Sequence, residues 1–201
     1  MQTPFTVYDY FKISIIQDSI ENVRKNLRHY LNDMSLVETE LATVDFRTVC
    51  STKSIPYNPR KIKFIVYEPL SNPGVTVFFP NFRDGWYTLV YNYTRLNQKI
   101  AFQVGFTIDE SKDFSAYFFS FFFVEKGEVQ ERCVHAIKEN KWVFYEKNKP
   151  PKIENTDNYL RKTIKERINN EIIIDYLKKA GYNLSDVGFF KSDRGVVLFS
   201  N

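Results

Sequence analysis

The stretch IAFQVGFTI, residues 100–108, carries the clearest strand pattern in the chain. Ile100, Phe102, Val104, Phe106 and Ile108 alternate with smaller or polar residues. Successive side chains of a strand point to opposite faces of its sheet. The alternation therefore predicts a strand with one buried face.

Three further strands are predicted directly after it. Residues 117–124 are apolar at nearly every position, which is typical of a central strand covered on both sides. A turn at residues 125–128 leads into a strand over 129–137, and a second turn leads into a strand over 142–145. Because antiparallel neighbours can be joined by short turns, we expect an antiparallel meander of four strands.

Helices are predicted on both sides of this meander. The first covers residues 18–33 with Asp18 as its N-cap, and the second runs to about Gln98 after an N-cap at Asp84. On the second, Trp86, Leu89, Val90, Tyr93 and Leu96 are spaced as one helix face. The third covers residues 156–180, where Asn169 is placed to cap a second helical segment.

The remaining apolar segments read as strands. They are residues 5–16, a segment around 41–46, a hairpin of 61–67 with 75–79, and a C-terminal hairpin of 188–190 with 196–199. Together, these elements predict one α+β domain over residues 1–201. We expect a mainly antiparallel sheet with about three helices packed on it.

Composition and cysteine use indicate a compartment. A chain with 43% hydrophobic and 26% charged residues has the profile of a soluble domain. The longest apolar run, residues 117–124, is too short to span a bilayer. Cys50 and Cys133 have no disulfide-framework or zinc-site spacing, and the first residues lack a signal-peptide pattern. We therefore expect a cytoplasmic protein with reduced thiols and no membrane partner.

The net charge of +4 admits several kinds of anionic partner. Nucleic acid, an anionic membrane and an acidic protein would all suit a basic chain. The cations are scattered, however, and no run of five Lys or Arg residues occurs. This pattern favours an ordinary solvated surface, and a nucleic-acid partner stays the alternative.

No motif in the sequence identifies a reaction. It contains no Gly-rich phosphate loop, nucleophile elbow, zinc signature or EF-hand loop. Cys133 and His135 share one face of a predicted strand and could form a nucleophile and base. A buried cysteine beside a hydrogen-bonded histidine explains the same spacing, and we favour it. We therefore expect no enzyme, no cofactor and no metal site.

One junction combines unusual residues. The stretch NFRDGW, residues 81–86, places Arg83, Asp84 and Trp86 between a predicted strand and a predicted helix. A capped helix with Trp86 in the core and Arg83 as a surface cation accounts for these residues. Trp and Arg are also favoured anchors of protein interfaces, so a partner-facing corner is the second interpretation.

The order of these pieces resembles immunity proteins of bacterial contact-dependent and polymorphic toxin systems. The resemblance rests on residues 79–86, the Phe-rich strand, Arg132, the stretch KWVF at 141–144, the helical residues 161–176 and Gly181-Tyr182. It implies a non-enzymatic protein that binds a toxin domain and blocks its active site. The candidate partner-binding residues are Arg83, Asp84, Trp86 and Arg132. Many such proteins are acidic, so this basic chain suits an acidic or non-nuclease toxin domain.

Overall fold

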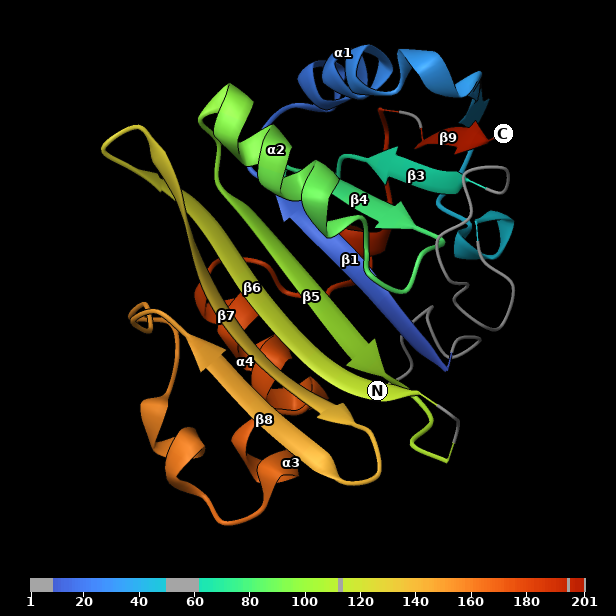
Figure 1. The fold of residues 1–201 in the computed structure, drawn as a ribbon. Helices are drawn as coiled ribbons and strands as arrows, with labels where there is room; N and C mark the ends of the chain where they lie inside the picture. The colour runs from blue at the N-terminus through green and yellow to red at the C-terminus, as the bar shows by residue number, and fades with distance from the viewer. Residues whose placement is uncertain (1–8, 50–61, 112–113, 195, 201) are drawn as a thin grey trace.

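The structure is a computed structural model that describes residues 9–49, 62–111, 114–194 and 196–200. In these ranges nine strands form one sheet in the order β2-β9-β3-β4-β1-β5-β6-β7-β8, and each neighbouring pair is antiparallel (Figure 1). The strands are β1 (Tyr10–Ile16), β2 (Val37–Leu41), β3 (Lys63–Tyr67), β4 (Thr76–Pro80), β5 (Ala101–Thr107), β6 (Ser115–Glu125), β7 (Glu128–Lys138), β8 (Trp142–Lys147) and β9 (Val196–Ser200).

Helices cover both faces of this sheet. In the described ranges, three have ten residues or more: α1 (Ile20–Tyr30), α2 (Tyr87–Asn97) and α4 (Asn170–Lys179). Figure 1 shows α1 and α2 over one face and α4 behind the strands. The predicted α+β class, with a mainly antiparallel sheet and about three helices, is confirmed. No helix of these ranges is both long enough and apolar enough to cross a membrane.

Shorter helical segments complete the chain. They are α3 (Ile164–Arg167) and the 3-10 segments η1 (Asn32–Met34), η2 (Phe46–Thr48), η4 (Thr156–Leu160) and η5 (Val187–Phe190). The third predicted helix is thus divided into η4, α3 and α4. Asn169 caps α4 as predicted, because its Oδ1 accepts a hydrogen bond of 3.0 Å from the Ile172 N–H.

One apolar cluster lies on each face of the sheet. Under α1 and α2 it includes Ile20, Val23, Leu27, Val90, Tyr93, Phe64, Phe78 and Phe122. Under α4 it includes Ile173, Tyr176, Leu177, Phe102, Phe119 and Val134. All seven residues of β5 are therefore buried. The prediction of only one buried face for residues 100–108 is wrong, because helices lie on both sides.

The predicted meander is confirmed. β5, β6, β7 and β8 are consecutive in the sheet, with Val104 opposite Phe119 and Phe119 opposite Val134. The turn between β6 and β7 has Lys126 and Gly127 at positive φ, as short hairpin turns require. The hairpin of β3 and β4 is also confirmed, and β4 ends at Pro80.

Two strand predictions are wrong. Residues 188–190 belong to η5, and β9 does not pair with them but lies between β2 and β3. The strand expected around residues 41–46 lies earlier, at Val37–Leu41, and Phe46 begins η2. The predicted strand over residues 5–16 is confirmed from Tyr10, and its first residues lie outside the described ranges.

The first helix begins one residue later than predicted. Ser19 is the N-cap of α1, and its hydroxyl accepts a hydrogen bond of 3.3 Å from the Asn22 N–H. Asp18 instead directs its carboxylate toward α2, where the Tyr93 hydroxyl donates to it over 2.9 Å. This residue consequently links the two helices.

Candidate functional site

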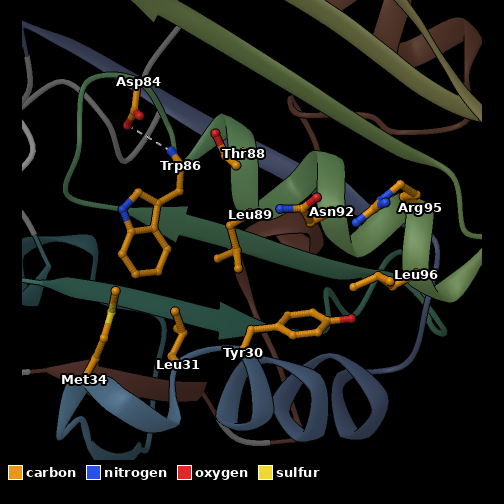
Figure 2. Close-up of a pocket in the computed structure, with 10 residues that line it drawn as sticks. All are labelled: Tyr30, Leu31, Met34, Asp84, Trp86, Thr88, Leu89, Asn92, Arg95 and Leu96. Atoms are coloured by element: carbon orange, nitrogen blue, oxygen red, sulfur yellow. Dashed lines mark hydrogen bonds between the residues drawn. The ribbon is translucent and has the colours of Figure 1, made fainter.

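An open groove of about 520 Å³ lies between α1 and α2. A volume of this size is within the range of ligand-binding clefts. Tyr30, Leu31 and Met34 line one side, and α2 with the loop before it lines the other (Figure 2). The residues from that second side are Asp84, Trp86, Thr88, Leu89, Asn92, Arg95 and Leu96. The groove therefore includes two of the four residues that the sequence indicated as partner-binding.

The loop before α2 brings these two residues together. Gly85 has φ 68°, and a Cβ atom there would lie 2.8 Å from Cβ of Lys12, so this position requires glycine. Asp84 is exposed and accepts a hydrogen bond of 3.0 Å from the Trp86 N–H (Figure 2). Trp86 is the N-cap of α2 and lies in the left-handed region. The predicted N-cap at Asp84 is thus wrong, because this carboxylate closes the loop that precedes the helix.

Trp86 belongs to both the core and the groove. Only 6% of it is exposed, and its ring lies 5.3 Å from the ring of Phe64 and 5.5 Å from that of Phe82. The same residue lines the groove beside Met34. The two interpretations of this junction are therefore compatible for Trp86.

Polar contacts tie the two walls of the groove together. The Asp18 carboxylate accepts hydrogen bonds of 2.9 Å from the Ser19 N–H, the Asn22 amide and the Tyr93 hydroxyl. One turn further along α2, the Asn97 amide donates to the Tyr30 hydroxyl over 3.0 Å. These contacts connect α2 to α1 and to Asp18, which precedes it, so they hold the two walls together near the C-terminal end of α2.

The Asp18 carboxylate should make the free energy of unfolding depend on pH. Burial would raise the pKa of Asp18, but hydrogen bonds from Asn22, Tyr93 and Ser19, with the charge of Lys99, hold it below its ordinary value of 3.8. The pKa of Asp18 is lower in the folded than in the unfolded protein. The ionised carboxylate therefore stabilises the fold at pH values above its ordinary pKa of 3.8. This contribution is lost as the pH falls through the folded-state pKa.

We therefore expect the free energy of unfolding to fall more steeply in the wild type than in Asp18→Asn between about pH 5 and pH 2. Urea denaturation across this range measures the slope. Asp33→Asn changes an exposed carboxylate and is the matched control. Equal slopes for wild type and Asp18→Asn would contradict the role given to Asp18.

Arg83 lies outside the groove. Its guanidinium carbon is 4.4 Å from the centre of the Phe114 ring, which is a cation–π arrangement. The side chain is half-buried, and it does not line the cleft beside Asp84. Arg83 therefore packs on Phe114 and does not line the groove.

Arg132 is fully buried and forms a structural network. Its Nε and Nη2 donate to both oxygens of Glu154 at 2.8–3.1 Å, and Nη2 also donates to Glu146 at 2.8 Å. Nη1 donates to the carbonyl oxygen of Asn148 at 2.6 Å. The guanidinium fastens β7 to the segment that follows β8. Burial leaves Arg132 no surface for a partner, which contradicts the partner-binding role predicted for it.

Cys133 and His135 are brought together but are not activated. The distance from Cys133 Sγ to His135 Nδ1 is 3.7 Å. Burial raises the pKa of the Cys133 thiol and lowers the pKa of the His135 imidazole. Both directions favour the uncharged pair over the thiolate and imidazolium of a reactive cysteine. In the described ranges, no group of three or more His, Cys, Asp or Glu could hold a metal ion.

Leu96 and Arg95 are groove residues that the sequence did not indicate as partner-binding. Leu96 was assigned to the buried face of α2 but is 56% exposed. Arg95 follows the helical spacing Thr88, Asn92, Arg95, and this spacing was available as a signal but was not used. A comparison of the chain with family models, curated proteins and solved structures found no match.

Proposed function

We propose that this protein binds another protein through the groove between α1 and α2. The observation that supports this role is the combination of an open cleft, a tryptophan at its floor and the exposed Leu96 at its rim. Interfaces place aromatic residues in a desolvated centre and surround them with polar groups. The groove has this arrangement, because Thr88, Asn92 and Arg95 border its apolar residues.

The specific role that we propose is neutralisation of a cognate toxin domain in the bacterial cytoplasm. The resemblance of the chain to immunity proteins supports this role, and the groove is a surface through which a toxin domain could be held. The function is non-enzymatic, in keeping with the uncharged Cys133 and His135 pair.

Nucleic acid fits the groove less well. Binding of single strands needs free aromatic faces next to several cations. The groove contains one Arg, and the ring of its tryptophan is covered by Phe64, Phe78 and Phe82. An acidic protein surface is the better match for the basic chain.

The experiment is co-expression with the C-terminal region of the protein encoded directly upstream. We expect growth inhibition when the present protein is omitted, and a stoichiometric complex at high salt when it is present. Leu96→Glu should weaken the complex at least tenfold, because it places a charge in an apolar contact. Leu160→Glu is the control, since Leu160 is 83% exposed and lies outside the groove.

Two results would count against the proposal. Absence of both growth inhibition and a complex would remove the toxin-neutralising role. A complex that Leu96→Glu and Leu160→Glu leave equally tight would place the interface elsewhere on the protein. Binding that falls steeply with salt and requires nucleic acid would support the alternative.

A further inference from the structure

The groove contains two charged residues, and their environments differ. Asp84 accepts a hydrogen bond from the Trp86 N–H and interacts electrostatically with Lys12. Lys12 is buried directly beneath the loop, and its Nζ lies 3.4 Å from the carbonyl oxygen of Asp84. The negative charge at this end of the groove is therefore already balanced by the protein itself.

The positive charge of Arg95 has no nearby side chain of opposite charge paired with it in the described ranges. Arg95 is exposed on the last turns of α2, and its guanidinium has no ion pair or hydrogen bond within the described ranges. In contrast, Arg24 and Arg28 of the neighbouring helix are paired with Glu38. The unbalanced charge of the groove is consequently positive and lies at the Arg95 end.

The groove also has distinct polar and apolar sides. Figure 2 shows Thr88, Asn92 and Arg95 along the side of α2 away from α1. Leu89 and Leu96 lie toward α1, where Leu31 and Tyr30 face them, and Met34 lies near Trp86. A segment in the groove would thus meet apolar side chains below and hydrogen-bonding groups along one edge.

From this arrangement we infer that the groove takes an acidic segment of the partner protein, with an apolar side chain placed on Leu89 and Met34 and a carboxylate paired with Arg95. This inference rests on the proposed function. A guanidinium binds a carboxylate through two parallel hydrogen bonds, which gives both affinity and register. Arg95 lies six positions after Leu89 and nine positions after Trp86, so the apolar and acidic positions are about 9 to 14 Å apart along α2. In an extended segment this distance corresponds to about three to four residues.

The test is selection of random peptides displayed on phage against the full-length protein. We expect the selected peptides to share an aromatic or aliphatic residue and an Asp or Glu at a constant spacing. Selection against Arg95→Glu should replace this acidic residue by Lys or Arg. Lys25→Glu removes an exposed cation of α1 that does not line the groove, and it should leave the acidic preference unchanged.

A synthetic peptide from the selection provides the quantitative measurement. Changing its acidic residue to the amide should weaken binding to the wild type about tenfold, the usual effect of losing a hydrogen bond to a charged group. The same change should have little effect on binding to Arg95→Glu, because the pairing is already absent.

The possible failures can be told apart. Peptides that lose binding to Leu96→Glu but show no acidic preference would overturn the pairing with Arg95 and leave the groove as a docking site. Peptides that bind Leu96→Glu as tightly as the wild type would show that the groove is not used, and the docking surface of the proposed function would also fall. Failure to select any peptide would overturn the inference, because the groove would not recognise a short segment.

Discussion

Replacing Arg132 by Met is expected to lower the free energy of unfolding by about 3–5 kcal/mol. The change leaves the Glu154 carboxylate without its cation, and the side chain of Glu154 is 0% exposed. Of the side chains that donate a hydrogen bond to Glu154, only the Tyr159 hydroxyl, at 2.6 Å, would remain. A buried charge without a partner costs far more than the pair contributes, so the loss should be large.

Glu146 offers a matched control on the same guanidinium. It also accepts from Arg132 Nη2 at 2.8 Å, but its side chain is 45% exposed. Glu146→Gln should therefore cost no more than about 1 kcal/mol, as expected of an exposed ion pair. Urea denaturation of both variants measures the difference between them.

A double replacement separates the loss of the ion pair from the loss of packing. Arg132→Met combined with Glu154→Leu removes both charges, and apolar groups in place of a buried ion pair are often tolerated. We expect the double variant to recover much of the stability lost by Arg132→Met alone. A loss of stability in Arg132→Met no larger than that in Glu146→Gln would contradict the role given to the buried ion pair.

Arg132 also shows what the sequence could reveal about burial. In the sequence, Arg132 shares a strand face with Val134 and Ala136, which is a signal for burial, but it was predicted to bind a partner. Its partner Glu154 lies in a loop 22 residues later, and no local pattern connects the two. Burial was therefore readable from the alternation, whereas the pairing that permits it depends on the folded chain.

The same distinction applies to the strands. β5 to β8 follow one another with short turns, so alternation and turn residues were sufficient to predict both the strands and their order. β9 lies between β2 and β3, which are far from it in sequence. Its apolar residues predicted a strand but contained no information on its neighbours, and the nearest apolar segment was wrongly chosen as its partner.

The groove was predictable only in part. Asp84 and Trp86 were identified because a charged residue and a tryptophan at a strand-to-helix junction are unusual. Leu96 continued the apolar spacing of α2, and such spacing normally marks a buried face. Its exposure arises because no element of the described chain covers this part of α2. A sequence pattern reports which residues are apolar, and the packing of the other elements decides which of them stay uncovered.

The second large effect is expected at Trp86. Replacement by Ala should lower the free energy of unfolding by about 3–5 kcal/mol, because the ring packs against Phe64, Phe78 and Phe82. Replacement by Phe keeps an aromatic ring and should cost less. Leu96→Ala is the control, since an exposed side chain of the same groove should change stability by no more than about 0.5 kcal/mol.

The backbone at this position permits a more specific expectation. Trp86 has φ 54° and ψ 50°, a left-handed conformation that costs a residue with a Cβ atom about 1–2 kcal/mol. Glycine adopts it without this cost. Trp86→Gly should therefore be less destabilising than Trp86→Ala, although both remove the ring and glycine usually disfavours the folded state more than alanine. Thermal and urea unfolding of the two variants test this order.

The order of these variants decides how binding experiments on Trp86 are interpreted. If Trp86→Ala is strongly destabilised and Trp86→Gly less so, the ring and the loop conformation are parts of the fold, and a loss of partner binding reports a disturbed groove. If both variants are as stable as Leu96→Ala, the ring is dispensable for folding and any loss of binding reports a direct contact. Because Leu96 and Arg95 reach the groove from exposed positions, they separate recognition from stability in a way that Trp86 does not.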